Sequence, residues 1–268
     1  MQVTRVHLLL FATLFLQTYK LEGSFEYQGA GWSAASANIG MVGRPNLDRA
    51  PKNPALLPYL IKPEFSLNYA TPYWGLDLHS GEFAFVLEWN NQPLVGEIAY
   101  LGDQVYSEKV ITLGTATTLD TVLVAGFTCQ VYQVSISDLY TRSTISFSPS
   151  FSFMISPKVQ LGSRIHNLVQ VKKRFMVPQR FNFGLAYLSE NMQLMIQVEK
   201  ESAHPPELCF GLEWQINPYF HLACGFRDES KSLSCGWKID LKPFSMHYSF
   251  VFHPELPSSH GLGVGLEF

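Results

Sequence analysis

Serine and histidine residues near the end of the chain are the first candidates for chemistry. Ser245, His247 and Ser249 alternate along one predicted strand, so their side chains share a face. A serine activated by a neighbouring histidine is the nucleophile of many hydrolases. Serine is common on this face of other segments too, so we interpret the pairing as chance. The chain also lacks G-x-S-x-G, H-E-x-x-H, P-loop and C-x-x-C patterns, and we expect no catalytic residue and no enzyme activity.

Two histidines flank the last predicted loop. His253 and His260 could approach one another if that loop closes. A zinc site requires three or four spaced ligands. We therefore interpret the two histidines as polar loop residues, and a metal site is the alternative. We expect neither a metal nor another cofactor.

Charged side chains on the polar face of the predicted strands form a second candidate set. Glu199 and Glu213 lie on neighbouring strands of one predicted hairpin. Buried charges are rarely unpaired, so salt bridges that fill an interior are the first interpretation. A polar gate or a contact to a ligand head group is the alternative. The candidates on the polar face are Glu82, Glu199, Glu213 and Lys238.

The chain contains four cysteines. If residues 228–231 form a turn, Cys224 faces Cys235 across a hairpin, where side chains are close enough to touch. A cross-strand disulfide and two small residues facing lipid both fit this position, and the second is preferred because disulfide geometry is demanding. Cys129 and Cys209 have no obvious partner.

The segments that carry these residues show a period of two in their hydrophobicity from about Phe65 onward. Large apolar residues alternate with small or polar ones, for example in 83–89, 145–155 and 181–187. About 14 such segments are roughly 8–12 residues long, near the ~9–11 residues that a tilted strand needs to cross a bilayer. We predict an all-β fold, a transmembrane antiparallel up-and-down β-barrel of about 14 strands, with 12 as the alternative count.

Connection lengths and composition support this prediction. Tight turns at 90–93, 156–157, 189–191, 216–218 and 240–243 alternate with longer loops such as 166–179 and 253–260. Short turns at one end and long loops at the other are typical of outer-membrane barrels. Only 15% of the residues are charged, and the net charge of −3 argues against nucleic acid as a partner. The chain ends in an alternating segment, 261–268, with a terminal Phe268 that resembles a barrel-assembly signal.

The N-terminal part has a different character. Residues 1–24, with Arg5 before an apolar core, match the layout of a secretory signal, and a short buried helix is the alternative. Residues 25–60 are rich in small residues and lack the period of two. We predict that they form a hatch or plug, because Trp32 and Met41 suit burial, while a disordered tether is the alternative. Residues 61–268 are predicted to form the barrel.

Several motifs resemble those of FadL-like and PorV/PorQ-like outer-membrane proteins. Asn53-Pro54-Ala55-Leu56 is similar to the N-P-A-[GL] signature of that group. Later matches are Pro178 to Tyr187, Val198-Glu199-Lys200, Gly211 to Trp214 and His247 to Leu256, with Gln197 and His247 where aspartate is usual. The resemblance covers 178–268 well and 30–57 loosely.

The resemblance implies a barrel of about 14 strands with an N-terminal hatch, in a group that includes long-chain fatty-acid and hydrocarbon transporters and barrels of type IX secretion. We expect a protein of the outer membrane that binds or passes a hydrophobic small molecule. The alternative is a non-conducting accessory of secretion or assembly. Expected partners are outer-membrane lipid, the barrel assembly machinery, and a hydrophobic ligand or secretion components. Candidates for ligand or hatch contacts are Trp32, Asn53, Pro54 and Pro149, where proline could kink its strand.

Overall fold

The computed structural model describes residues 30–60, 62–171, 175–202 and 204–268. The predicted signal segment, 1–24, lies outside the described residues. Within them no helix is long and apolar enough to cross a membrane. The elements are η1 (Trp32–Ser36), η2 (Pro54–Tyr59), β1 (Glu64–Thr71), β2 (His79–Trp89), β3 (Gln92–Gly102), β4 (Tyr106–Asp120), β5 (Leu123–Ile136), β6 (Tyr140–Ser156), β7 (Val159–His166), β8 (Val169–Val171), β9 (Arg180–Leu188), β10 (Met192–Glu201), β11 (Glu207–Asn217), β12 (Phe220–Arg227), β13 (Ser232–Leu241), β14 (Phe244–Phe252) and β15 (Ser259–Glu267).

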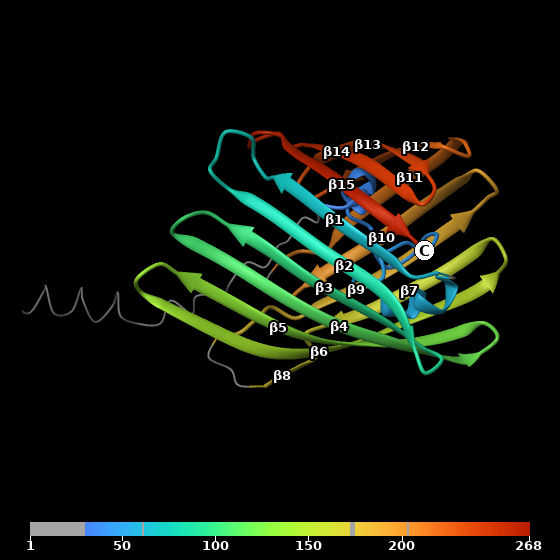
Figure 1. Cartoon of the computed structure of the whole chain (residues 1–268), viewed down its shortest axis with the longest axis horizontal. Coiled ribbons are helices and arrows are strands. Elements are labelled where there is room, and N and C mark those ends of the chain that lie inside the picture. The colour runs from blue at the N-terminus through green and yellow to red at the C-terminus, as the bar shows by residue number, and fades with distance from the viewer. Residues whose placement is uncertain (1–29, 61, 172–174, 203) are drawn as a thin grey trace, which may run out of the picture.

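The strands form one closed antiparallel barrel, which confirms the predicted fold (Figure 1). Apart from β8, strands that follow each other in the chain pair side by side. β1 also pairs with β15, and β7 pairs with β9. Fourteen strands make up the ring, while the short β8 pairs only with β6. A closed ring has no free edge, so each of its fourteen strands has a hydrogen-bonding neighbour on both sides, as a lipid environment requires.

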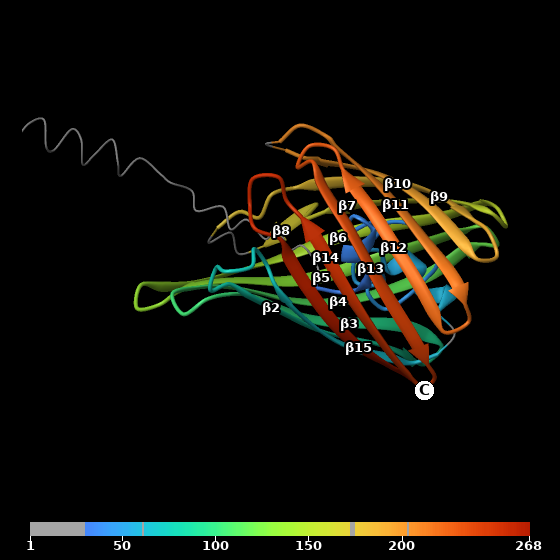
Figure 2. The same cartoon turned by 90° about the horizontal axis from the view of Figure 1, so that it is seen from above.

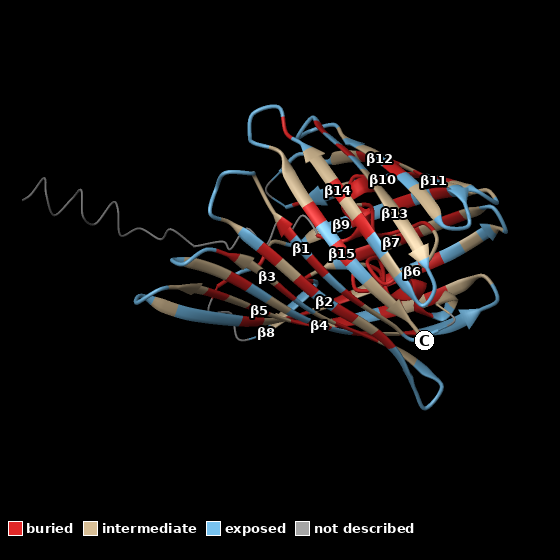
Figure 3. Cartoon of the chain, turned by 45° about the horizontal axis from the view of Figure 1, so that its top comes forward, coloured by how far each residue is buried: buried red, intermediate tan, exposed pale blue. Residues whose placement is uncertain are grey.

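Buried and exposed residues alternate along the strands (Figure 3). Large apolar side chains such as Phe83, Leu113 and Phe183 are exposed on the outside. Small and polar side chains such as Ser148 and Thr128 are buried inside. A soluble barrel would have the opposite arrangement, because its apolar side chains would pack in the interior, away from the surrounding water.

Long and short connections lie at opposite ends of the barrel. The tight turns, the start of β1 and Phe268 share one end, called here the turn end, where the Phe268 amide donates to the Pro63 carbonyl at 3.0 Å. The opposite end, called here the loop end, carries longer loops, for example 72–78 and 253–258.

Residues 30–60 form a hatch inside the barrel (Figure 2, coloured blue). Its two short 3₁₀ helices are η1 and η2, and η2 begins where the Asn53 side chain accepts a hydrogen bond from the Ala55 amide at 3.1 Å and Pro54 takes the first position. The barrel makes room for the hatch with small residues. A Cβ at Gly162 would lie 2.0 Å from the Met41 carbonyl oxygen.

Pro149 lies where the pairing of β6 changes partner. On one side, residues 150–156 of β6 pair with β7 and 145–147 pair with β8, so Pro149 falls in the gap. On the other side it pairs with Phe127 of β5 without a register shift. The Met154 amide donates to the carbonyl of Val122, the residue just before β5, which continues the β5–β6 register. The amides of odd-numbered residues in this part of β6 therefore point toward β7. The missing N–H of Pro149 therefore falls in the gap between the β7 and β8 pairings of β6. The hydrogen bonds between β6 and β5 stay intact.

Cys224 and Cys235 are direct partners in the β12–β13 register, and both are free and exposed on the outer face. The Asp240 amide donates to the carbonyl of Tyr219, its opposite residue, at 2.9 Å. Hydrogen-bonded pairs alternate along the strands, which makes the cysteine pair a non-hydrogen-bonded one with a Cα separation of ~4.5 Å.

We expect mild oxidation of the purified protein with a copper–phenanthroline reagent to join these two cysteines in nearly every molecule, because their spacing lies within disulfide range. Cys129 and Cys209 should remain alkylatable in the same sample, since neither faces another cysteine. Mass spectrometry of alkylated tryptic peptides measures both. Cross-linking through Cys129 or Cys209 instead would contradict the register.

Candidate functional site

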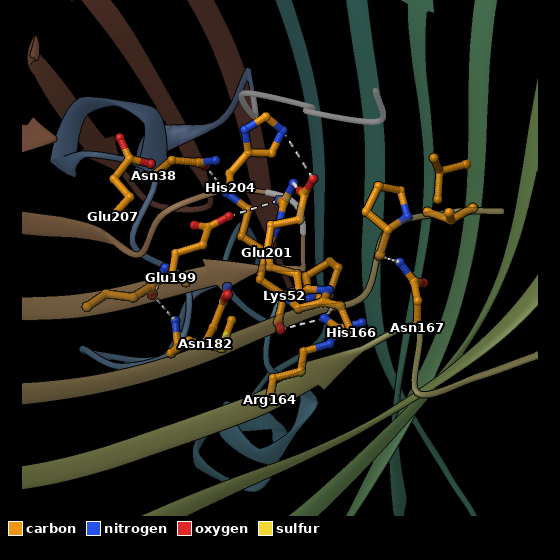
Figure 4. Close-up of a pocket in the computed structure, with 18 of the residues that line it drawn as sticks. Asn38, Lys52, Arg164, His166, Asn167, Asn182, Glu199, Glu201, His204 and Glu207 are labelled. Atoms are coloured by element: carbon orange, nitrogen blue, oxygen red, sulfur yellow. Dashed lines mark hydrogen bonds and ion pairs between the residues drawn. The ribbon is translucent and has the colours of Figure 1, made fainter. Parts of the chain in front are cut away.

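A cavity of about 360 Å³ lies between the hatch and the loop end of the barrel. We call it the vestibule (Figure 4). Hatch residues such as Met41 and Lys52 line it at the bottom, and the residues His204 and Glu229, from connections at the loop end, line it at the top. A space of this volume is within the usual range for sites that bind small molecules.

Hydrogen bonds from the barrel wall hold the hatch beneath the vestibule. Arg164 of β7, which is 1% exposed, donates to the carbonyl of Pro51 at 2.6 Å and to that of Lys52. The Gln197 side chain of β10 accepts from the amides of Gly40 and Met41 at 3.3 and 3.2 Å. These contacts satisfy hatch backbone groups that would otherwise be buried without partners, so they fix the hatch backbone to the wall.

A buried ion pair fixes the hatch on its other side. The Arg49 guanidinium is bonded to the carboxylate of Glu213 on β11, and both residues are buried. The same carboxylate accepts from Trp32 Nε1 at 3.1 Å, Ser36 Oγ at 2.8 Å and Gln193 Nε2 at 2.5 Å. One carboxylate therefore joins two hatch segments to two strands, and the pairing compensates for the burial of both charges.

Asp48 and Lys52 extend this polar network within the hatch. Asp48 accepts from the Trp32 amide at 2.7 Å and from Asn68 Nδ2 at 3.2 Å. The Lys52 ammonium donates to Ser33 Oγ at 2.6 Å and to Asn38 Oδ1. Removal from water lowers the pKa of Lys52, and neighbouring carboxylates, that of Glu82 first, act in the opposite direction.

Ion pairs line the wall of the vestibule toward the loop end. Arg180 of β9 lies 2.9 Å from Glu199 and 2.8 Å from Glu201. Arg227 of β12 pairs with Glu207 and lies 3.7 Å from Glu199. Each of these guanidinium groups therefore has two carboxylate neighbours, and the carboxylates outnumber the guanidinium groups in this part of the wall.

Part of the vestibule wall is apolar, where Val110, Tyr132 and Val177 line it. Tyr132 and Val134 of β5 pack against Phe175 and Val177 of the connection between β7 and β9. That connection is held inward by the Gln170 side chain, whose amide groups bond to both backbone groups of Val177, at 2.6 and 3.1 Å. A molecule in the vestibule would meet apolar side chains on one side and charged ones on the other.

The structure places the predicted candidates in separate roles. Trp32 contacts Glu213, and Asn53 and Pro54 are buried in the hatch. Glu199 and Glu213 lie on one hairpin but at opposite ends, since Glu199 faces Glu207 and Glu213 faces Gln193. Only Glu199 among the eight candidates lines the vestibule. The remaining three are Glu82, which is buried, Lys238, which lies 3.1 Å from Asp240 near the turn end, and Pro149 in the β6 gap.

Sequence reasoning missed the cations that hold the hatch, Arg49, Lys52 and Arg164. Arg164 was detectable, because it follows Gln160 and Gly162 on the polar face of an alternating segment. The two hatch cations stand in a segment without periodicity, where nothing local indicates which side chain points inward. No metal-binding group of three or more His, Cys, Asp or Glu residues occurs among the residues that the structure describes.

The chain matches no protein-family model and no curated protein. Its fold is similar to several solved structures. The Ralstonia pickettii toluene transporter TbuX aligns with a TM-score of 0.73 at 11% identity, over 91% of this chain and 100% of that one. The Pseudomonas putida toluene transporter TodX gives 0.64 at 11% identity, over 92% and 98%. A Pseudomonas aeruginosa FadL homologue gives 0.63 at 8% identity, over 89% and 98%.

These similarities show that the chain has the barrel fold of these structures. Two of the three named structures are described as toluene transporters and the third as a FadL homologue. The alternative of a PorV/PorQ-like accessory barrel receives no support from them.

Proposed function

We propose that this protein is an outer-membrane barrel that takes up a hydrophobic small molecule into the vestibule and passes it inward under the control of the hatch. The observation that carries the proposal is the position of the cavity, which lies between the loop end and a hatch bonded to the barrel wall. A filled barrel without such a space would suit an accessory role better.

The outer surface supports the proposed location. Exposed apolar side chains cover the strands, and the aromatic residues Trp89, Trp214 and Phe268 lie exposed near the turn end. Aromatic girdles of this kind sit at membrane interfaces. The loop end would then face outward and the vestibule would receive molecules from outside the cell.

Passage requires that the hatch moves or opens, because its residues close the barrel below the vestibule. Asn53 is fully buried, and its side chain both caps η2 and donates to the Met41 carbonyl at 2.7 Å. Replacing Asn53 and Pro54 with glycine removes these bonds and the rigid first position of η2. We expect uptake of radiolabelled toluene into proteoliposomes to become several-fold faster in this variant.

The matched control replaces Asn90 and Asn91 with glycine. These residues form the β2–β3 turn with positive φ values of 49° and 62°, which glycine adopts without strain. The control should take up toluene at the wild-type rate. Equal rates in all three proteins would contradict a gating role of the hatch, and no uptake above protein-free liposomes would contradict the transport proposal itself.

A further inference from the structure

Three buried polar atoms in the vestibule wall have no hydrogen-bond partner. They are Arg164 Nε, His166 Nε2 and Asn182 Oδ1. Arg164 and His166 lie on β7, and the register pairs Arg164 directly with Asn182 of β9. All three residues line the vestibule, and Figure 4 shows them along one part of its wall. Arg164 and Asn182 are 1% and 5% exposed.

A buried polar group without a partner is costly, so such groups in a cavity wall indicate what a bound molecule should supply. Arg164 Nε can only donate a hydrogen bond, and Asn182 Oδ1 accepts one, while His166 Nε2 can do either. A hydroxyl group both accepts and donates. It could therefore satisfy the arginine and the asparagine together.

The charges around the vestibule argue against an anionic ligand. Its lining contains four Lys or Arg residues and five Glu residues, histidines apart. Both guanidinium groups nearer the loop end, Arg180 and Arg227, already pair with carboxylates, and Glu229 adds a further negative charge beside them. A molecule that enters from the loop end would pass this acidic region first, which disfavours anions.

We infer that the vestibule binds a hydrophobic molecule that carries a neutral hydrogen-bonding group, of the class of phenols and alcohols, rather than a plain hydrocarbon or a carboxylate. The polar group lies at Arg164 and Asn182. The apolar part lies against the wall formed by Val110, Tyr132 and Val177. This inference rests on the proposed function and specifies the ligand class of the same cavity.

The test uses three probes built on one ring, namely phenol, toluene and benzoate at neutral pH. Binding to the full-length protein in amphipol is measured by saturation-transfer NMR competition, with an unrelated outer-membrane barrel as background. We expect phenol to bind roughly three- to tenfold more tightly than either other probe, the range for one or two neutral hydrogen bonds.

Two variants assign the polar contact. Asn182→Leu removes the acceptor with little change in size, and it should abolish the preference for phenol while toluene binding stays or strengthens. His166→Phe provides a second test if the first variant folds poorly, with folding checked by heat-dependent gel mobility. Asn191→Leu, the same substitution at an exposed turn residue outside the cavity, should leave the preference unchanged.

Equal or tighter binding of toluene, or a phenol preference that survives both variants, would overturn the inferred ligand class and leave the proposed function standing. Tightest binding of benzoate would overturn the charge argument. Binding of none of the probes would contradict the inference and the proposed function together.

Discussion

Replacing Glu213 with leucine is expected to lower the free energy of unfolding by about 3–5 kcal/mol, the range for breaking a buried ion pair by removing one partner. The variant leaves the Arg49 guanidinium buried without its carboxylate. Trp32, Ser36 and Gln193 lose the same acceptor. Thermal unfolding followed by heat-dependent gel mobility, together with urea titration in detergent, measures the loss.

The double variant Arg49→Met/Glu213→Leu separates the ion pair from the other contacts. Replacing both charges with apolar residues removes the uncompensated charge, so at least half of the lost stability should return. Lys242→Ala serves as the surface control, because Lys242 pairs with Glu267 at 3.5 Å with its side chain 76% exposed, and exposed pairs contribute ~0–1 kcal/mol. If the double variant lost as much stability as the two single variants added together, the energetic coupling between Arg49 and Glu213 would be contradicted.

Replacing Gly162 with alanine is expected to displace the hatch. The added Cβ would lie 2.0 Å from the Met41 carbonyl oxygen, a backbone atom that cannot move without the hatch. Overpacking of this kind costs roughly 1–3 kcal/mol. Hydrogen exchange measured by mass spectrometry should show faster exchange of the hatch amides near Met41, with the barrel strands little changed.

Gly81→Ala is the matched control for this substitution. It also replaces a strand glycine, but its Cβ would meet no atom within 4 Å. The control should exchange like the wild type and unfold at the same denaturant concentration. Hatch exchange that is equally slow in Gly162→Ala would show that the hatch does not pack against β7 in solution.

The barrel was predictable because its physical requirement is repeated at every strand. A strand between lipid and a polar interior must alternate, and Phe83, Phe85 and Leu87 display that rule locally. Connection lengths supplied the orientation of the ends. The predicted count of about 14 strands matches the ring, although β4 and β5 are longer than a bilayer needs.

The contacts of the hatch were not predictable in the same way. Trp32 and Glu213 were each singled out, yet their hydrogen bond joins residues 181 positions apart. No periodicity links two such positions, and the choice of partner depends on the three-dimensional path of the hatch. The vestibule depends on the same path, because Lys52 and Met41 become its floor only once residues 30–60 enter the barrel.

The most direct test of a membrane-spanning barrel is cell fractionation of the expressed full-length protein, with outer-membrane samples compared on SDS gels before and after heating. We expect the protein in the outer-membrane fraction, resistant to extraction at high pH, with a changed mobility after boiling. Recovery in the soluble periplasmic fraction, with no change in mobility on heating, would contradict the membrane barrel and with it the proposed route through the vestibule.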